Sequence, residues 1–249
     1  MKFSRRTLAL TGLAPLALAL TACDSSPDDE AALDGEPIAA IAAPDGTSWL
    51  ETVSVSESNG FILGNPDAPI KLIEYGSLTC GACAGFAAEA VEPLKEKYVS
   101  TGVVSYELRN QVHNGIDLVL ARMVRCGAPE SFHPLSEQVW ANLSTILDTA
   151  NQNGAGIEAA MQLPEDQRFA GVAQAAGLFD FFAARGLSAD QATSCLADAE
   201  AVQAIGERST KQSQELNVTS TPTFFINGKN VGNHNWGSLE PMLQRAGAR

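Results

Sequence analysis

The strongest constraint on this chain is a pair of cysteines separated by two residues, Cys80-Gly81-Ala82-Cys83. An apolar run at 70–75 precedes the pair, and an alanine-rich stretch follows it. Two thiols with this spacing, placed where a strand passes into a helix, are typical of a redox-active site. The pattern predicts a sheet strand at 70–75 and a helix that begins at Cys80.

A helix N-terminus gives the two thiols different expected roles. The first N–H groups of a helix lack intrahelical acceptors, and the helix dipole adds partial positive charge, so the pKa of Cys80 should fall. Cys83 lies about one turn further along, where it can attack a mixed disulfide formed at Cys80. We interpret Cys80 as the nucleophile and Cys83 as the resolving thiol.

A structural disulfide and half of a metal site are the alternative interpretations of the pair. A zinc site would need a second Cys or His pair at compatible spacing, whereas His113, His133 and His234 occur singly. We therefore expect no metal and no other cofactor. Each lone histidine is interpreted as a surface or structural residue.

The first 22 residues predict export from the cytosol. Basic residues that include Arg5 and Arg6 precede an apolar run at 7–22, which Gly12 and Pro15 interrupt. This run is too short and too broken for a membrane span and is typical of a signal peptide. The paired arginines resemble a twin-arginine signal, so the export route stays open.

The end of the signal peptide predicts a lipid anchor. Leu20-Thr21-Ala22-Cys23 resembles the bacterial lipobox, in which the cysteine is diacylated and becomes the first residue of the mature protein. Asp24 resembles the retention signal of inner-membrane lipoproteins. We therefore expect a lipid-anchored protein on the periplasmic side of a bacterial membrane, at the inner membrane.

The segment 23–60 predicts an acidic disordered tether. From Asp24 to Gly60 the sequence has nine acidic residues and no Lys or Arg, with abundant Pro, Gly, Ser and Ala. Such a composition buries too little apolar surface to fold alone. The folded domain is then expected at 61–249, and its acidic balance gives no basis for a nucleic-acid partner.

Four cysteines remain once Cys23 is assigned to the anchor. They allow three pairings, and the close spacing of Cys80 and Cys83 favours one redox pair plus a structural Cys126–Cys195 disulfide. That bridge would close a loop of about 69 residues and restrict the unfolded chain. Two separate buried thiols remain the alternative.

Hydrophobic periodicity predicts an alternating order of strands and helices. The helix after Cys80 should kink or end at Pro93, and the two strands that flank it should be parallel by the right-handed crossover rule. Asn227-Gly228 predicts a type I′ hairpin. The expected elements are a strand at 70–75, a helix at 80–99, a strand at 103–109, about five helices within 113–216, strands at 223–226 and 229–231, and a helix at 238–245.

This order is that of an α/β thioredoxin-like fold with a central helical insertion of about 100 residues. Two further motifs make the resemblance specific: Gly-Asn-Pro-Asp-Ala-Pro at 64–69, and Thr221-Pro222-Thr223 before the late strand. The chain resembles the DsbA-like thiol-disulfide oxidoreductases of the thioredoxin-fold superfamily. The resemblance covers about 61–243.

The resemblance assigns roles to three further residues. It implies that Pro222 is a cis-proline facing Cys80 and that the backbone of Thr221 docks substrate; an ordinary proline at a strand start is the alternative. Glu74 stands in an otherwise apolar strand, where burial should raise its pKa. By resemblance it relays a proton to Cys83; an exposed glutamate on an edge strand is the alternative.

The resemblance implies an extracytoplasmic oxidoreductase that exchanges its Cys80–Cys83 disulfide with thiols of exported proteins. Its partners would be reduced or misoxidised exported proteins and a membrane redox partner. A reductase or isomerase of the same fold, and a tethered chaperone whose thiols hold a soft metal ion, are the alternatives. Gly81-Ala82 replaces the Pro-His of the best-known oxidase, so we expect a less depressed Cys80 pKa and a weaker oxidant.

Overall fold

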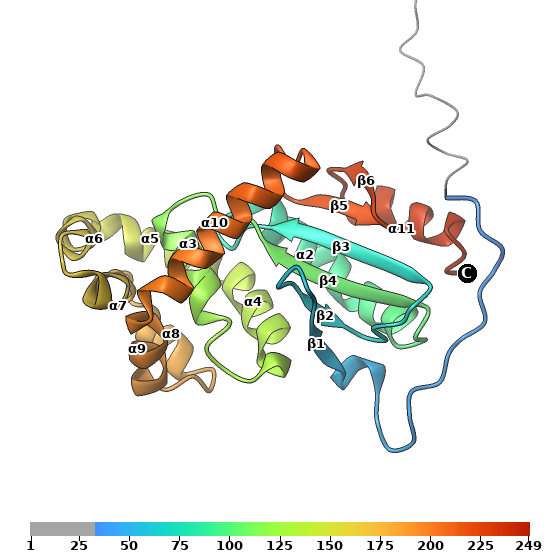
Figure 1. Ribbon diagram of the computed structural model, residues 1–249, viewed down its shortest axis with the longest axis horizontal. Helices are drawn as coiled ribbons and strands as arrows, with labels where there is room; N and C mark the ends of the chain where they lie inside the picture. The colour runs from blue at the N-terminus through green and yellow to red at the C-terminus, as the bar shows by residue number, and fades with distance from the viewer. Residues whose placement is uncertain (1–32) are drawn as a thin grey trace, which may run out of the picture. The chain divides into compact units, whose positions relative to one another are not determined.

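Six strands form one mixed sheet in the order β1-β2-β4-β3-β5-β6 in the computed structural model, which describes residues 33–249 (Figure 1). Of the neighbouring strands, only β3 and β4 are parallel. The strands are β1 (Val53–Val55), β2 (Phe61–Leu63), β3 (Ile70–Gly76), β4 (Val104–Asn110), β5 (Thr223–Ile226) and β6 (Lys229–Gly232).

The sheet topology brings three distant segments to one edge. In the β3–β4 pair, Gly76 lies opposite Asn110, so both strands end at the same edge of the sheet. Strand β5 is antiparallel to β3 and starts beside it, with Thr223 opposite Tyr75. The segments that follow β3, follow β4 and precede β5 therefore meet there. The expected parallel crossover and the hairpin strand at 223–226 are confirmed.

The helices between residues 132 and 197 form the block at the left of Figure 1. The helices and helical turns of the described chain precede, connect or follow the strands. They are η1 (Trp49–Glu51), α2 (Gly81–Leu94), the π-helical turn η2 (Lys95–Val99), α3 (Gly115–Met123), η3 (Pro129–Ser131), α4 (Phe132–Ala141), α5 (Leu143–Gln152), α6 (Gly154–Met161), α7 (Glu165–Ala175), α8 (Leu178–Ala183), α9 (Ala189–Ala197), α10 (Ala199–Leu216) and α11 (Trp236–Arg245).

The helical insertion has the expected bounds but more helices than expected. Eight α-helices, α3 to α10, lie between residues 115 and 216, where the sequence predicted about five. Asn142, Asn153 and Asp198 each end one helix and begin the next. The glycines at 154 and 156 mark the junction at Asn153 in the sequence, whereas no Gly or Pro stands beside Asn142 or Asp198, so those two junctions were not predicted.

The core lies between the sheet and α2. Leu72 and Phe224 are fully buried on the covered face of the sheet, and the ring of Phe224 lies 4.6 Å from that of Phe86 on α2. Burying one such side chain stabilises the fold by roughly 1.5–3 kcal/mol. The expected break at Pro93 takes the form of the π-helical turn that directly follows α2. This packing holds the N-terminus of α2 firmly against the edge where β3 ends.

The prediction of a disordered tether is wrong for residues 33–60. The backbone N–H groups of Gly35 and Ile38 donate to the carbonyls of Arg245 and Gly247, at 2.7 and 2.9 Å. Leu33 is buried, and β1 pairs with β2 at the sheet edge. The acidic average of the segment concealed a few apolar side chains and backbone groups that pair with the domain. The folded unit therefore includes residues 33–60, which we expected to lie outside it.

The expected signal peptide, the lipobox cysteine Cys23 and the start of the tether lie outside the described residues. Within 33–249, no helix is long and apolar enough to cross a bilayer.

Gly102→Ala should release the N-terminal segment from the domain. Gly102 has φ +72, and an added Cβ would lie 2.5 Å from both the Ile41 carbonyl oxygen and the Trp49 indole nitrogen. Gly186→Ala is the matched control, because Gly186 has φ +93 and open space around it. We expect the control to cost about 1 kcal/mol of backbone strain, and Gly102→Ala to cost about 2 kcal/mol.

Thermal unfolding measures both costs, and limited proteolysis near Trp49 detects release of the segment. Equal costs with no new cleavage would show that the segment does not depend on this contact.

Candidate redox site

Cys80 stands at the N-cap of α2, and its own sulfur caps the helix. The residue has extended backbone angles, and its Sγ accepts a hydrogen bond from the Cys83 N–H at 3.4 Å. Cys80 is half-buried, whereas Cys83 has 0% exposure. Both thiols are free. Only the Cys80 sulfur is open to an incoming molecule, as the two expected roles require.

The surroundings of the two sulfurs separate their pKa values. A hydrogen bond from the Cys83 side chain is the main cause that lowers the pKa of Cys80 from 9 to about 5, against a smaller opposing effect of burial. Hydrogen bonding by Thr221 and by backbone N–H groups adds to the lowering. The bond to Cys80, together with burial, raises the pKa of Cys83 well above its ordinary value. At neutral pH the reduced site therefore holds a Cys80 thiolate beside a Cys83 thiol.

Titration of the reduced protein should show a thiolate with a midpoint near pH 5 in ultraviolet absorbance. Cys83→Ala removes the main hydrogen-bond donor, so we expect its midpoint to shift toward 9. A folded-state pKa below the unfolded one stabilises the fold above it, so the Cys80 thiolate should contribute stability that grows as pH rises from 5 to 9 and is lost as pH falls through 5, seen as the difference between reduced wild type and Cys80→Ala. A wild-type midpoint near 9 would contradict this geometry.

The peptide bond between Thr221 and Pro222 is cis. The carbonyl oxygen of Thr221 lies 3.4 Å from the Cys80 Sγ, where the thiol form donates to it. This contact joins residues 141 positions apart, and it arises because β5 starts at the edge where β3 ends. The structure therefore places this turn directly beside the reactive sulfur.

Glu74 lies beneath the cysteines with 0% exposure, on the covered face of β3. The Tyr106 hydroxyl donates to its Oε2 at 2.6 Å, and its Oε1 has no hydrogen-bond partner. Burial raises the pKa of Glu74 to about 8. Its negative charge in turn raises the pKa of Cys83, so the two groups interact electrostatically. The alternative of an exposed edge glutamate is wrong.

The other two cysteines of the domain form a disulfide. Cys126, just after α3, is bonded to Cys195 on α9, with their Cα atoms 5.8 Å apart. The bridge spans 69 positions of the chain and ties two helices of the insertion together. The alternative of two separate buried thiols is therefore wrong.

The sequence did not identify Asp117 as part of the site, and it predicted only a surface or structural role for His113. Asp117 is buried, and its carboxylate accepts hydrogen bonds from the segment that precedes Cys80. His113 is exposed, and its Nε2 lies 3.3 Å from the Thr221 hydroxyl. The spacing of Asn114 and Asp117 at the start of α3 is that of a helix cap, which was the one available signal. His133, by contrast, is buried and bonded to a backbone carbonyl, as a structural histidine would be.

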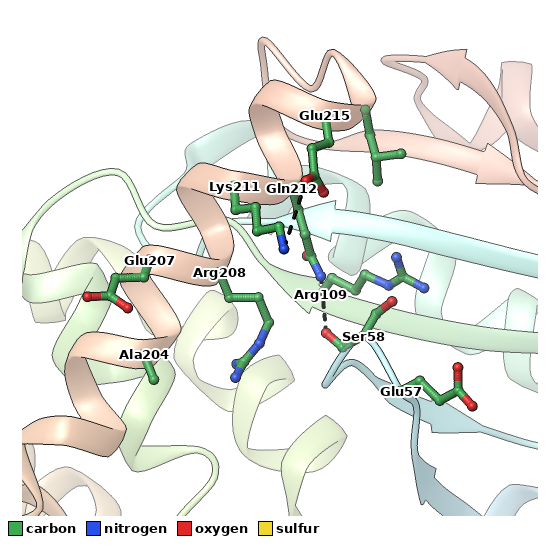
Figure 2. Close-up of a pocket in the computed structure, with 10 residues that line it drawn as sticks. Glu57, Ser58, Arg109, Ala204, Glu207, Arg208, Lys211, Gln212 and Glu215 are labelled. Carbon is green, nitrogen blue, oxygen red and sulfur yellow. Dashed lines mark hydrogen bonds and ion pairs between the residues drawn. The ribbon is translucent and has the colours of Figure 1, made fainter.

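A separate cavity of about 660 Å³ lies between α10 and the turn that joins β1 to β2 (Figure 2). Arg208, Lys211 and Gln212 line it from α10, and Gln212 donates to the Ser58 carbonyl at 3.1 Å. Neither redox cysteine lines this cavity. Within 33–249, no three His, Cys, Asp or Glu side chains are grouped so that they could hold a metal ion.

Comparison with known sequences supports the fold and the chemistry. A family model described as thioredoxin matches residues 56–245. A candidate protein-disulfide oxidoreductase of Rickettsia bellii is 22% identical over 82% of this chain and 70% of its own length. Another, of Rickettsia conorii, is 24% identical over 76% of this chain, which spans only 61% of that relative.

Solved structures with the same fold are also found. The protein-disulfide isomerase of Novosphingobium aromaticivorans is 28% identical, with a TM-score of 0.68 over 74% of this chain and 94% of its own. The α-DsbA1 of Wolbachia pipientis shares the fold, with a TM-score of 0.63 at 22% identity over 77% and 92% of the two chains. The chain thus belongs to the thioredoxin family, with a DsbA-like fold that carries a helical insertion.

Proposed function

We propose that the protein oxidises thiols of exported proteins with its Cys80–Cys83 disulfide. A substrate thiolate attacks the Cys80 sulfur, which forms a mixed disulfide and releases Cys83 as a thiolate. A second substrate thiolate then attacks the substrate sulfur of that mixed disulfide and releases the Cys80 thiolate. The substrate leaves as a disulfide, and two electrons stay on the enzyme dithiol. A membrane redox partner would accept these electrons.

The observation that supports this direction is the pKa of about 5 at Cys80. A thiol with a low pKa is a good leaving group, and its stable thiolate favours the reduced form of the enzyme. The value lies between about 7 for thioredoxin and about 3.5 for DsbA. It agrees with our expectation of an oxidant weaker than DsbA, because Gly81-Ala82 provides no charge beside the sulfur.

Three further residues support the exchange in this proposal. The cis turn at Pro222 and the backbone of Thr221 form the edge along which an extended substrate docks. Glu74 exchanges a proton with Cys83. It supplies a proton when substrate oxidation releases the Cys83 thiolate, and it accepts one when Cys83 attacks a mixed disulfide that Cys80 forms with the redox partner during reoxidation. Its pKa of about 8 makes it a base matched to neutral pH.

The proposal places the protein on the periplasmic side of the inner membrane, anchored by a lipid on Cys23. Because residue 33 already belongs to the folded unit, only residues 24–32 separate that cysteine from the domain. Nine residues reach at most about 30 Å when fully extended. The domain would therefore work close to the bilayer, where a membrane redox partner is within reach.

An isomerase is the second candidate, favoured by the similarity to the Novosphingobium protein-disulfide isomerase. Redox titration of the purified protein against glutathione separates the two functions. We expect a reduction potential well above that of thioredoxin, which is about −270 mV. A value near that of thioredoxin, with rapid rearrangement of a wrongly bonded substrate, would favour the isomerase and overturn oxidation.

A further inference from the structure

Asp117 is a buried carboxylate that the exchange reaction does not use. Its side chain is 1% exposed, in the first turn of α3, and it accepts three hydrogen bonds. The Ser77 hydroxyl donates to Oδ2 at 2.7 Å, the Leu78 N–H to Oδ1 at 2.9 Å, and the His113 N–H to Oδ2 at 2.9 Å. A buried carboxylate with this many donors is held in one place.

These three donors come from two segments that flank the redox pair. Ser77 and Leu78 belong to the loop that joins β3 to Cys80, while His113 precedes α3. The loop sets the position of both sulfurs, because the Cys80 N–H donates to the Ser77 carbonyl at 3.3 Å. A backbone hydrogen bond from Ser77 also acts on Cys83. Asp117 thus fixes the loop to the first helix of the insertion.

The same carboxylate reaches the opposite side of the site through His113. The imidazole Nε2 of His113 lies 3.3 Å from the hydroxyl of Thr221, which belongs to the turn beside the Cys80 sulfur. Asp117 holds the backbone of His113, and the side chain of His113 contacts Thr221. Both walls of the site, the loop before Cys80 and the cis-proline turn, therefore depend on one anchored group.

We propose that Asp117 is a positioning residue that holds the redox pair and the substrate-docking turn in register. It acts through the loop at 77–79 and through His113, and it does not touch the reacting sulfur. The proposal rests on the proposed function, because its consequence is the tuning of Cys80 and the docking of substrate. It assigns the helical insertion a part in the redox site besides its own packing.

Asp117→Asn is the central variant. Asparagine has the same shape as aspartate, but an NH₂ group replaces one of the two acceptor oxygens. This NH₂ group cannot accept from an N–H or O–H donor, so at least one of the three hydrogen bonds is lost. We expect the thiolate midpoint of Cys80 to rise from about 5 toward 9. The reduction potential should become less oxidising, and kcat/KM for a reduced peptide should fall about tenfold, mainly through KM.

Ser209→Ala is the matched control. The Ser209 hydroxyl is also buried, and it accepts the Val112 N–H at 2.8 Å on α10, next to the same segment. Its loss should lower the melting temperature without moving the Cys80 midpoint. If Asp117→Asn behaves like Ser209→Ala, with lower stability but an unchanged midpoint, potential and KM, then Asp117 is merely structural and the proposal is overturned.

Ser77→Ala keeps the test decisive if Asp117→Asn does not fold. It removes a single donor to the carboxylate, so we expect a smaller shift of the midpoint in the same direction. No shift in Ser77→Ala would then overturn the proposal. The potential of the wild-type protein tests the proposed function separately, since only differences between variants concern Asp117.

Discussion

Cys80→Ala should abolish thiol-disulfide exchange. Cys83→Ala should accumulate mixed disulfides with proteins whose disulfides its Cys80 thiolate attacks, because no resolving thiol remains. Cys80 carries the only sulfur of the pair that is open to solvent, and its low pKa keeps it ionised. Cys83 is buried and can reach only a sulfur bonded to Cys80. Without this nucleophile, we expect the rate of thiol-disulfide exchange to fall by a factor of about 10³ or more.

Non-reducing electrophoresis of proteins captured by each variant distinguishes these roles. A matched control is the double variant Cys126→Ala/Cys195→Ala, which removes the other disulfide and should retain exchange, although with lower stability. Capture of substrates by Cys80→Ala, rather than by Cys83→Ala, would reverse the assignment of nucleophile and resolving thiol.

Glu74→Gln should make the protein more stable at neutral and alkaline pH while slowing its reaction. The pKa of Glu74 is about 8 in the folded protein and about 4.5 in the unfolded chain. An acid with a raised folded-state pKa destabilises the fold progressively as pH rises from 4.5 to 8, because the unfolded state releases the proton first. We expect a gain of up to about 5 kcal/mol above pH 8 and no gain below pH 4.5.

The same substitution removes the proposed proton acceptor for Cys83. General base catalysis is typically worth a factor of 10² or more, so attack of Cys83 on a mixed disulfide held at Cys80, the step needed for reoxidation, should slow by about a hundredfold. Denaturant unfolding across pH and stopped-flow kinetics measure the two effects. Glu92→Gln, at an exposed glutamate on α2, is the control and should change neither. A stability gain that does not depend on pH would show that burial does not perturb Glu74.

The exposed sulfur and the buried one were predictable from local pattern alone. Residues 70–83 have the pattern of a strand, a turn and the start of a helix, which predicts Cys80 at the N-terminus of that helix. The structure places Cys80 there as the N-cap. The hairpin at Asn227-Gly228 was equally local, since positive φ at both residues, 50° and 83°, is what that turn type requires. Such signals involve neighbours in the sequence and survive without tertiary context.

The ordered structure of residues 33–60 was not predictable from their composition. Their folding depends on hydrogen bonds to the far end of the chain, such as that from Ile38 to Gly247, and on a glycine at position 102 that leaves room for Ile41 and Trp49. A window of sequence contains only one side of each of these contacts. The acidic average therefore predicted disorder where pairing across the fold produces order.

The sequence by itself determined the chemistry of this protein: two thiols at the start of a helix, a lone acid in a buried strand and a proline before the last hairpin. These follow from residue type and spacing. Only the tertiary structure decided how the groups meet. The Thr221 carbonyl contacts Cys80, the His113 imidazole contacts Thr221, and the Asp117 carboxylate contacts the loop before Cys80, all from segments far apart in the chain. The parallel pairing of β3 with β4 and the antiparallel pairing with β5 bring these segments to one edge, a consequence of sheet topology that no local pattern contains.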